Sequence, residues 1–399
     1  MTTTVSEART DVLAEAKSIQ DWIVDIRRKL HMCPEVMYEE VHTGELIRQV
    51  LDELNIPYQF PVARTGIVAT IGNGAEPCVA LRADMDALPM HEETQVEFRS
   101  RIDGRMHACG HDCHMAMLLG AARILKDHES ELRGTVKLIF QPAEEGGAGG
   151  KLMCEEGALA NPRVDNIFGI HVWPFTPTGT VAGRAGTLLA AAGIVEIKIV
   201  GKGGHAAFPH TTNDPVITAA KIITELQTIV SREVDPLEPA VVTIAAIHGG
   251  DAFNVIPPDV QLTGTVRSLT NEGLQYLQKR VREIATHVAA ANRCEAEVTF
   301  PGNAYPPTIN DAQAWNEAKS LGAAMLGPES VLEHPPVMGG EDFAFYGPYA
   351  RSCFALLGIR NESVGSTYAL HNPKFMMDED ALPIGAALHV GYALRHLPQ

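Results

Sequence analysis

The chain has 399 residues, 45% of them hydrophobic and 20% charged, so it is long enough to form two domains with substantial cores. Its 32 basic and 49 acidic residues give a formal charge of −17 without any basic stripe, which argues against a nucleic-acid binder. It has no apolar run of the roughly 18 residues that a membrane span needs, no apolar signal segment at its start, and seven scattered cysteines instead of a disulfide framework. We therefore expect a cytoplasmic protein with reduced thiols that binds neither nucleic acid nor membrane.

The first 186 residues alternate between helical and strand patterns. Apolar residues from Val12 to Leu30 follow helical spacing and predict one amphipathic helix. Four short apolar runs follow, GIVATIG, CVALRAD, VKLIF and NIFGIHVW, with helical segments between them. This alternation is typical of an α/β domain in which a mostly parallel sheet carries helices on both faces.

From about residue 187 the pattern changes. The run IVEIKIV alternates as a half-exposed strand does, and a helix begins after Asp214 and Pro215. Two strands, a helix with apolar residues from Leu274 to Val288, and the strand AEVTF come next. This order of strand, helix, strand, strand, helix, strand predicts an inserted ferredoxin-like α+β domain over 187–299. Residues 1–186 and 300–399 are then expected to form the first domain together.

Polar residues able to bind metals stand near the ends of the predicted strands. Asp84 and Asp86 follow one strand, Glu144 and Glu145 follow another, and His171 lies in a third. Taken singly, an acidic pair is commonly a solvated surface feature and an isolated histidine a core residue. Ligands of an open α/β sheet, however, bind outside the carboxyl ends of its strands, so these side chains are expected to converge in one crevice.

The segment MHACGHDCHMA adds thiol and imidazole groups to this set. Cys109 and His111 lie two residues apart, so a turning backbone can aim both at one metal ion. A redox pair of Cys109 and Cys113 is the alternative, but their spacing is not that of the C-x-x-C dithiol motif. A closed structural zinc site would need a second pair of ligands, and the sequence offers none. Mixed ligands beside a spare glutamate favour metal-dependent hydrolysis, with Glu144 as base and Glu145 as ligand.

Ten segments, taken in chain order, resemble the metal-dependent aminoacylase and carboxypeptidase family of amidohydrolases, in its hippurate hydrolase and auxin-conjugate hydrolase branch. They cover nearly the whole chain and include HMCPEVMYEE, LRADMDALPM, MHACGHDCHMAMLLGAA, FQPAEEGGAGG, GKGGHAAFPH and MGGEDFAFY. The resemblance implies hydrolysis of N-acyl-L-amino acids, such as hippurate or N-acetyl amino acids, to a carboxylic acid and a free amino acid. It also implies two divalent metal ions per subunit, of Zn, Mn, Ni or Co.

Carried over residue by residue, the resemblance implies five metal ligands: Cys109, His111, Glu145, His171 and His371. Glu144 is implied as the general base and acid, which deprotonates metal-bound water and protonates the departing amine. Residues expected to orient the ligands without binding metal are Asp86, Asp112, His114 and Glu341. Other branches carry a histidine ligand where Asp84 stands, so Asp84 is not expected to bind metal.

The resemblance gives the inserted domain the roles of lid and dimerisation module, in a homodimer or a tetramer. His205 is implied as the donor that stabilises the oxyanion, in its own or the partner's site, and Asn254 and Arg267 as contacts of the substrate carboxylate. Two alternatives stay open: a dipeptidase or carboxypeptidase on the same scaffold, and a non-catalytic metal- or ligand-binding protein on a hydrolase fold. The intact Glu144 argues against the second, because a binding protein needs the ligands but not the base.

Overall fold

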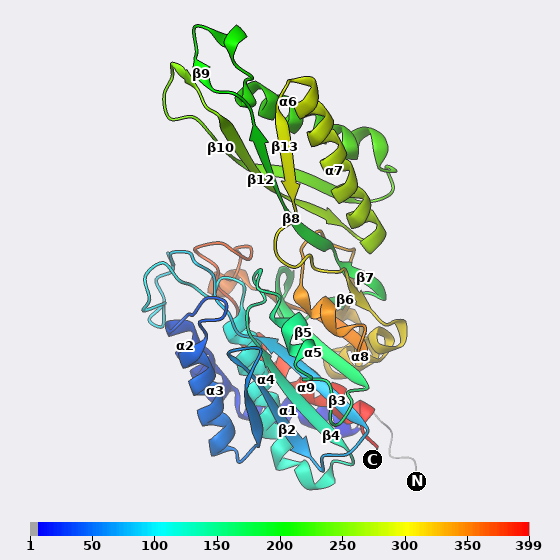
Figure 1. Ribbon diagram of the computed structural model, residues 1–399. Coiled ribbons are helices and arrows are strands. Elements are labelled where there is room, and N and C mark those ends of the chain that lie inside the picture. The colour runs from blue at the N-terminus through cyan, green and yellow to red at the C-terminus, as the bar shows by residue number, and fades with distance from the viewer. Residues whose placement is uncertain (1–6, 399) are drawn as a thin grey trace. The chain divides into compact units, whose positions relative to one another are not determined.

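The computed structural model describes residues 7–398, which divide into two compact units. Unit 1 comprises the described chain up to Leu188, Ile309–Pro335 and the chain from Asp342 onward, and unit 2 comprises Leu189–Thr308 and Pro336–Glu341. Figure 1 labels the elements of both units.

The boundaries of unit 2 differ from the 187–299 expected for an inserted domain. The chain remains in unit 2 up to Thr308 because the backbones of Tyr305 and Ala192 exchange hydrogen bonds of 2.8 and 3.0 Å. A second passage, Pro336–Glu341, also belongs to unit 2, and its Gly339 carbonyl accepts a bond from the Ala190 amide. Local periodicity does not reveal such a passage, because it carries no strand or helix pattern of its own.

Unit 1 is built on an eight-stranded sheet in the order β1-β2-β4-β3-β5-β16-β6-β15. The strands are β1 (Tyr58–Val62), β2 (Gly66–Gly72), β3 (Cys78–Asp84), β4 (Thr135–Gln141), β5 (Asn166–Pro177), β6 (Val181–Gly183), β15 (Val331–Glu333) and β16 (Arg351–Arg360). The central strands β4, β3, β5 and β16 are parallel, whereas β1 and β2 are antiparallel additions at one edge and β6 pairs antiparallel with β16. The predicted mostly parallel α/β sheet is confirmed.

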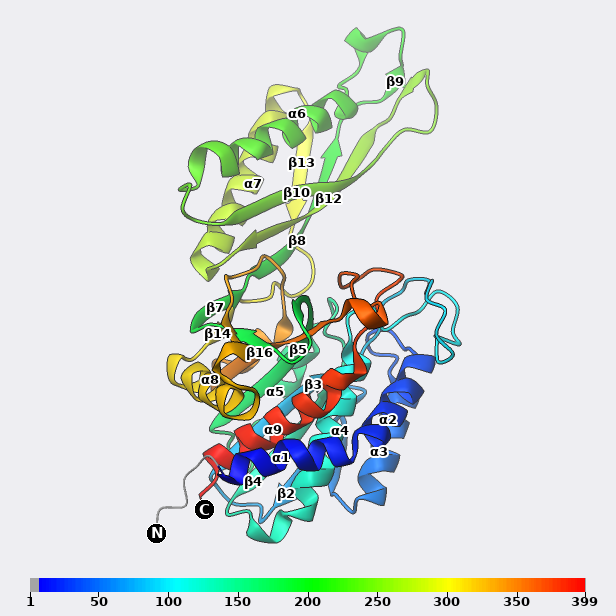
Figure 2. The same ribbon diagram turned by 180° about the vertical axis from the view of Figure 1, so that it is seen from behind.

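The helices of unit 1 are α1 (Glu7–Ser18), α2 (Gln20–Met32), α3 (Val41–Glu53), α4 (His111–Asp127), α5 (Gly149–Glu155), α8 (Ala312–Leu326) and α9 (Leu382–His396). Figure 2 shows α9 lying beside α1 although the two helices come from opposite ends of the described chain. The single helix predicted from Val12 to Leu30 is wrong, because the chain breaks between α1 and α2. There the Ser18 hydroxyl bonds to the Glu15 carbonyl, a local bond that competes with helix continuation.

The two faces of the sheet carry different helices, as the alternation along β4 shows. Val136, Leu138 and Phe140 lie in the hydrophobic core together with α4. Lys137 points to the opposite face, where its ammonium group donates to the carbonyl of Ala158, beyond the end of α5. Helices α4 and α5 therefore cover opposite faces, and the parallel strands between them end at one edge.

Unit 2 contains a four-stranded antiparallel sheet in the order β10-β12-β8-β13. Its elements are β8 (Ala191–Val200), β9 (Gly204–His205), α6 (Pro215–Thr228), β10 (Ala240–His248), β11 (Val255–Ile256), β12 (Asp259–Ser268), α7 (Asn271–Ala291) and β13 (Glu295–Thr299). Val195, Ile197 and Ile199 of β8 are buried against α6 and α7, as their alternation predicted. This topology is the ferredoxin-like order expected from the sequence.

Two short strands, β7 (Gly186–Leu189) and β14 (Thr308–Asn310), contain the positions where the chain leaves and re-enters unit 1. Among residues 7–398, every helix is too short or too polar to cross a membrane.

Candidate metal centre

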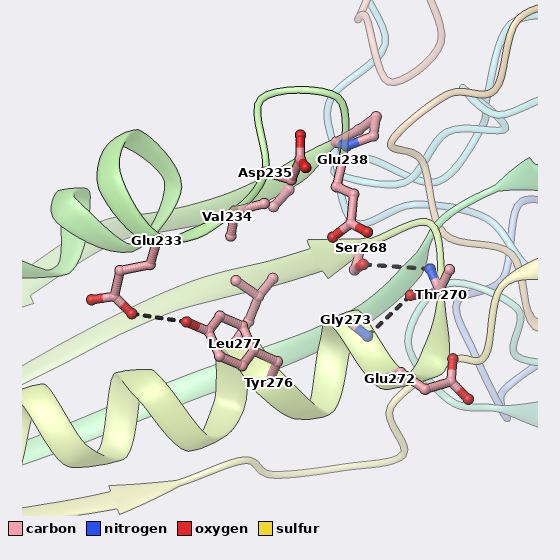
Figure 3. Close-up of a pocket in the computed structure, with 12 residues that line it drawn as sticks. Glu233, Val234, Asp235, Glu238, Ser268, Thr270, Glu272, Gly273, Tyr276 and Leu277 are labelled. Atoms are coloured by element: carbon pink, nitrogen blue, oxygen red, sulfur yellow. Dashed lines mark hydrogen bonds between the residues drawn. The ribbon is translucent and has the colours of Figure 1, made fainter.

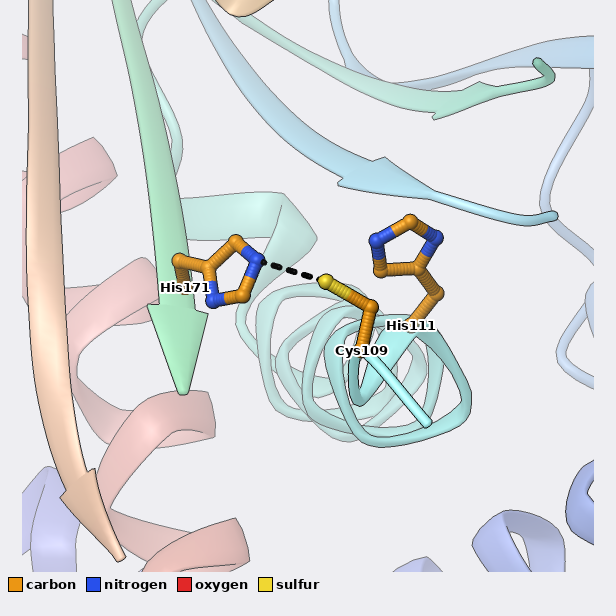
Figure 4. Close-up of side chains that lie close together, drawn as sticks. All are labelled: Cys109, His111 and His171. Carbon is orange, nitrogen blue, oxygen red and sulfur yellow. Dashed lines mark hydrogen bonds between the residues drawn. The ribbon is translucent and has the colours of Figure 1, made fainter. Parts of the chain in front are cut away.

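Cys109, His111 and His171 come together in unit 1 at the edge where the parallel strands end. One ligand atom from each of the three lies within 4.8 Å of the other two, and the Cys109 Sγ is 3.4 Å from the His171 Nε2 (Figure 4). His111 is the first residue of α4 and Cys109 lies two residues before it, whereas His171 comes from β5. Residues 62 positions apart thus form one group, as convergence at the strand ends requires.

A second group shares Cys109 with the first. It contains Cys109, Glu145 and His371, again with ligand atoms within 4.8 Å of one another. The His371 Nε2 lies 2.9 Å from the Glu145 Oε1. All five residues expected as ligands therefore belong to two groups that share the Cys109 thiol.

The backbone adopts left-handed conformations at two positions of these groups, Gly110 and His371. Gly110 has φ +92°, and a Cβ there would lie 2.3 Å from a methyl group of Val172, so only glycine fits between Cys109 and His111. His371 has φ +59°, a conformation that non-glycine residues rarely adopt. Its amide donates to the Ala108 carbonyl at 2.9 Å, which holds the C-terminal ligand beside the α4 cluster.

Hydrogen bonds fix the orientation of the His111 and His171 rings and leave one nitrogen of each ring available to a metal ion. The Nδ1 of His111 donates to the Asp86 carbonyl at 2.7 Å, and the Nδ1 of His171 donates to the Val172 carbonyl at 2.8 Å. Because a carbonyl oxygen only accepts, both rings present Nε2 for another partner. The Nε2 of His111 is buried and has no hydrogen-bond partner among residues 7–398. This is the donor set that a borderline divalent cation takes.

The electrostatics also favour a cation. Burial works against a charged His111, but Asp84, Asp86 and Glu145 outweigh it and raise the pKa of His111 to about 10. Burial, reinforced by the nearby carboxylates of Glu145 and Glu144, raises the pKa of the Cys109 thiol well above its usual range. The thiolate form therefore requires a positive charge beside it, which a divalent ion provides.

Glu144 and Glu145 lie in a sharp turn after β4, and both carboxylates lie near His111. Their amides donate to the two carboxylate oxygens of Asp86, each at 2.9 Å. The Asp342 amide donates to the Oε1 of Glu144 at 3.4 Å, and Glu144 is only 6% exposed. Glu145 lies with Cys109 and His371 in one group, and ligand atoms of both glutamates and of His111 lie within 4.8 Å of one another, so the turn brings both carboxylates to the same centre.

Three of the residues expected to orient ligands lie in unit 1 and contact them or their neighbours. Asp86 bonds to His111 through its carbonyl and to the Glu144–Glu145 turn through its carboxylate. His114 donates through Nδ1 to Asp84 at 2.5 Å and accepts the Val172 amide at Nε2. Both nitrogens of His114 are therefore in use, and its ring supports the strand that carries His171.

Asp112 lies next to His111 at the start of α4. Its Oδ2 accepts bonds from the Arg27 Nε and the His31 Nδ1, each at 2.8 Å, and all three side chains are buried. Arg27 and His31 hold the pKa of Asp112 far below its ordinary value against the effect of burial. This network ties α2 to the helix end that presents His111.

The remaining expected residues belong to unit 2. His205 is exposed on β9, where its backbone pairs with Val255 of β11 and the neighbouring Ala206 amide donates to the Asn254 carbonyl. The structure thus brings His205 and Asn254 close to each other. Arg267, on β12, donates to the Met338 carbonyl at 2.8 Å, and burial lowers its pKa.

Glu341 is the last residue of the second passage of unit 2 and is buried. Its carbonyl accepts a bond from the Thr308 hydroxyl at 3.3 Å within the same unit. The roles expected for Glu341 and for the other three residues of unit 2 stay predictions.

The sequence motifs did not indicate a role for Arg82, whose partners Gln141 and Asp342 contact the turn that carries the two glutamates. Arg82 is 1% exposed on β3 and donates to Gln141 at 2.9 Å, Asp84 at 2.7 Å and Asp342 at 3.0 Å. Gln141 also receives the Tyr346 hydroxyl. A signal was present, since an arginine in the otherwise apolar run CVALRAD needs buried partners.

Unit 2 also holds a separate concavity of about 470 Å³ between β10, α7 and the segment after α6. Figure 3 shows acidic residues at its margin, among them Glu233, Asp235, Glu238 and Glu272. Glu233 already accepts the Tyr276 hydroxyl at 3.0 Å. Nothing in this concavity resembles the donor set of the metal centre.

Replacing Cys109 with serine is expected to weaken metal binding by more than the about 10–100-fold that loss of an orienting residue costs, because the substitution removes the one residue common to both candidate ligand groups. Competition with a chromogenic chelator measures this affinity. Cys154→Ser is the matched control, since Cys154 is also 7% exposed but lies on α5 outside both ligand groups. Unchanged metal affinity in Cys109→Ser would remove the thiol from the ligand set.

Comparison with known proteins supplies the family. The model of "Peptidase family M20/M25/M40" matches residues 80–395. The chain is 49% identical to IAA-amino acid hydrolase ILR1-like 2 of Arabidopsis thaliana, over 99% of this chain and 90% of that protein. It is 40% identical to thermostable carboxypeptidase 2 of Saccharolobus solfataricus, over 96% and 97% of the two chains, and 40% identical to the N-acetylcysteine deacetylase of Bacillus subtilis, over 93% and 95%.

A solved structure agrees with these relatives. The YXEP protein of Bacillus subtilis, described as a dinuclear metal binding peptidase from the M20 family, superposes with a TM-score of 0.80 at 36% identity, over 96% of this chain and 99% of that one. The fold, the metal-ligand groups and the matches along the whole chain lead to one family. The chain belongs to peptidase family M20/M25/M40, and with it to the metal-dependent amidohydrolases that its motifs predicted.

Proposed function

We propose that this protein hydrolyses the amide bond of N-acyl-L-amino acids and releases a carboxylic acid and a free amino acid. The observation that carries the proposal is the pair Glu144–Glu145, whose carboxylates both lie beside His111. Glu145 also lies with Cys109 and His371, whereas Glu144 accepts the Asp342 amide. Relatives named for hydrolysis of an auxin conjugate and for deacetylation of N-acetylcysteine support the substrate class.

Cys109, His111, Glu145, His171 and His371 would hold two divalent ions. When bound, such ions polarise the scissile carbonyl and lower the pKa of water. Glu144 accepts the proton of the attacking water at its carboxylate and returns it to the leaving nitrogen. The Asp342 amide keeps the Glu144 carboxylate turned to the ligand groups during both transfers. The mixture of thiol, imidazole and carboxylate donors suits Zn, Ni, Co or Mn.

The residues of unit 2 complete the proposal. His205 is the candidate donor to the oxyanion, and its exposure on β9 leaves the ring accessible to substrate. Asn254, beside it, and Arg267 are candidates for the substrate carboxylate, which a guanidinium group binds through paired hydrogen bonds.

Subunit association and location are further parts of this proposal. We place a homodimer contact on unit 2, where Phe208, Leu237, Phe253 and Val255 are exposed apolar residues, and the molar mass from sedimentation equilibrium tests it. A cytoplasmic location accords with seven free thiols, and cell fractionation tests it.

Removal of metal is expected to abolish hydrolysis. The protein is dialysed against a chelator, and Zn, Mn, Co or Ni is then added singly before hippurate and N-acetyl-methionine are supplied. We expect no turnover without metal and recovery with at least one ion, because the ions supply the electrophile. A chelated protein that retains its full rate would contradict a metal-dependent mechanism.

The same reconstituted protein separates the two enzyme candidates. Dipeptides and N-blocked peptides are compared with N-acetyl and N-benzoyl amino acids by their kcat/KM values. Preference for the N-acyl amino acids supports the proposal. Preference for the peptides would assign the protein to carboxypeptidase or dipeptidase activity instead, as the 40% identical carboxypeptidase illustrates.

A further inference from the structure

The turn after β4 is held in an unusual way. Three successive amides, those of Ala143, Glu144 and Glu145, donate to side-chain carboxylates and not to backbone carbonyls. Asp86 takes the second and third. The first goes to the Oε1 of Glu40 at 2.9 Å. Hydrogen bonds to a carboxylate group are stronger than those to neutral acceptors when the group is ionised, so this is a firm way to fix a short turn.

The Ala143 position is where the turn most needs support. Ala143 has φ +54°, in the left-handed region that residues other than glycine rarely occupy, and its side chain is fully buried. Such a conformation persists only where surrounding contacts determine it. The amide bond to Glu40 is a contact of this kind, and it lies one residue before Glu144.

Glu40 comes from a part of the chain that the proposed chemistry does not otherwise use. It is the last residue of the segment HMCPEVMYEE and directly precedes α3. Its side chain is fully buried, and its Oε2 accepts the Thr65 hydroxyl at 2.6 Å. The Tyr38 hydroxyl donates to the Gly147 carbonyl at 2.7 Å. Tyr38 and Glu40 therefore form hydrogen bonds with both ends of the glutamate turn, at Gly147 and at Ala143.

We propose that Glu40 is a positioning residue, which holds the Ala143 end of the turn so that Glu144 and Glu145 reach the metal centre together. This inference rests on the function proposed above for Glu144 and Glu145. Glu40 does not touch a ligand atom or the reacting atoms in this scheme. Its removal leaves the buried Ala143 amide without an acceptor and allows the turn to relax.

The test compares three replacements of Glu40 in the full chain. Glu40→Ala removes the acceptor, and Glu40→Asp keeps the charge but withdraws it by one methylene. Glu40→Gln keeps an acceptor oxygen at the original distance. Burial, opposed by the Thr65 hydroxyl bond, raises the pKa of Glu40 to about 7, so the native carboxyl populates both its charged and its neutral form near neutral pH, and glutamine reproduces the shape and the charge of the neutral form.

We expect Glu40→Ala and Glu40→Asp to lower both kcat and metal affinity by about 10–100-fold, the range typical of residues that orient ligands, with a smaller change in KM. Glu40→Gln is expected to restore most of both quantities. Metal affinity is measured by chelator competition, which needs no substrate. A failure of the proposed function therefore leaves this test intact.

Glu35→Ala is the matched control. Glu35 is a buried carboxylate of the same segment that accepts the amides of His42 and Thr43 at the start of α3. Its side chain makes neither of the contacts with the glutamate turn. We expect lower thermal stability in this variant with metal affinity and kcat unchanged.

Two results would overturn the inference. One is native metal affinity and kcat in a folded Glu40→Asp protein. The other is an equal loss of kcat and metal affinity in Glu35→Ala, which would mean that any damage near α3 disturbs the centre. If Glu40→Ala does not fold, Glu40→Asp and Glu40→Gln decide the question between them.

Discussion

Glu144→Gln is expected to lower kcat by about 10²–10⁴-fold, the share of rate that a positioned acid–base group contributes, while metal content stays at the native value. Glutamine retains the shape of the side chain and an oxygen that accepts the Asp342 amide, but it cannot take a proton from water. The rate is measured with an N-acyl amino acid on metal-saturated protein, and the metal content by elemental analysis of the same sample.

The adjacent residue supplies the control for this variant. Glu145→Gln is expected to lose metal affinity first and activity as a consequence, because Glu145 belongs to the ligand group with Cys109 and His371. Added metal should then restore part of the rate of Glu145→Gln but none of that of Glu144→Gln. Near-native turnover in metal-replete Glu144→Gln would remove it from its role as base.

Arg82→Met is expected to reduce the free energy of unfolding by about 3–5 kcal/mol, because it breaks a buried ion pair from one side only. Arg82 is 1% exposed and lies between the fully buried carboxylates of Asp84 and Asp342. Methionine fills much of the space of the arginine stem but leaves both carboxylates without that cation. Urea denaturation of the metal-free protein measures the change.

Arg28→Met provides the comparison at the surface. Arg28 is 46% exposed and pairs with Glu379, an arrangement that solvent screens, so we expect a change of about 0–1 kcal/mol. If the free energy of unfolding of Arg82→Met falls by no more than the about 1 kcal/mol expected for a surface pair, the buried network around Arg82 does not stabilise the fold as its burial implies.

The features predicted correctly from sequence depend on short-range patterns. The central strands appear as apolar runs, and the inserted unit as an ordered set of alternating and helical segments. The approach of His171 and Glu145 to Cys109 agrees with one general rule, that parallel strands end at the same edge, whereas the roles of these residues as ligands were implied by the family resemblance. Each of these predictions needs only the local pattern of each segment and a rule about fold class.

The missed features depend on partners that are distant in the chain. Arg82 meets Gln141 59 residues away and Asp342 260 residues away, and no periodicity encodes either pairing. Glu40 reaches Ala143 across 103 residues. The break between α1 and α2 was missed for a different reason, because apolar spacing continues through a position where the backbone hydrogen bonds change.

The strand order of unit 1 has a consequence for synthesis on the ribosome. Strand β5 pairs on one side with β3 and on the other with β16. The ribosome synthesises β16 about 180 residues after β5, at the usual rate of about 5–20 residues per second. The elements β8 to β13 of unit 2 are complete before β16 is translated. The nascent chain therefore carries the elements of a ferredoxin-like unit while one edge of β5 still lacks its partner strand, and the backbone groups of that edge are open to pairing with other strands until Arg351–Arg360 emerges.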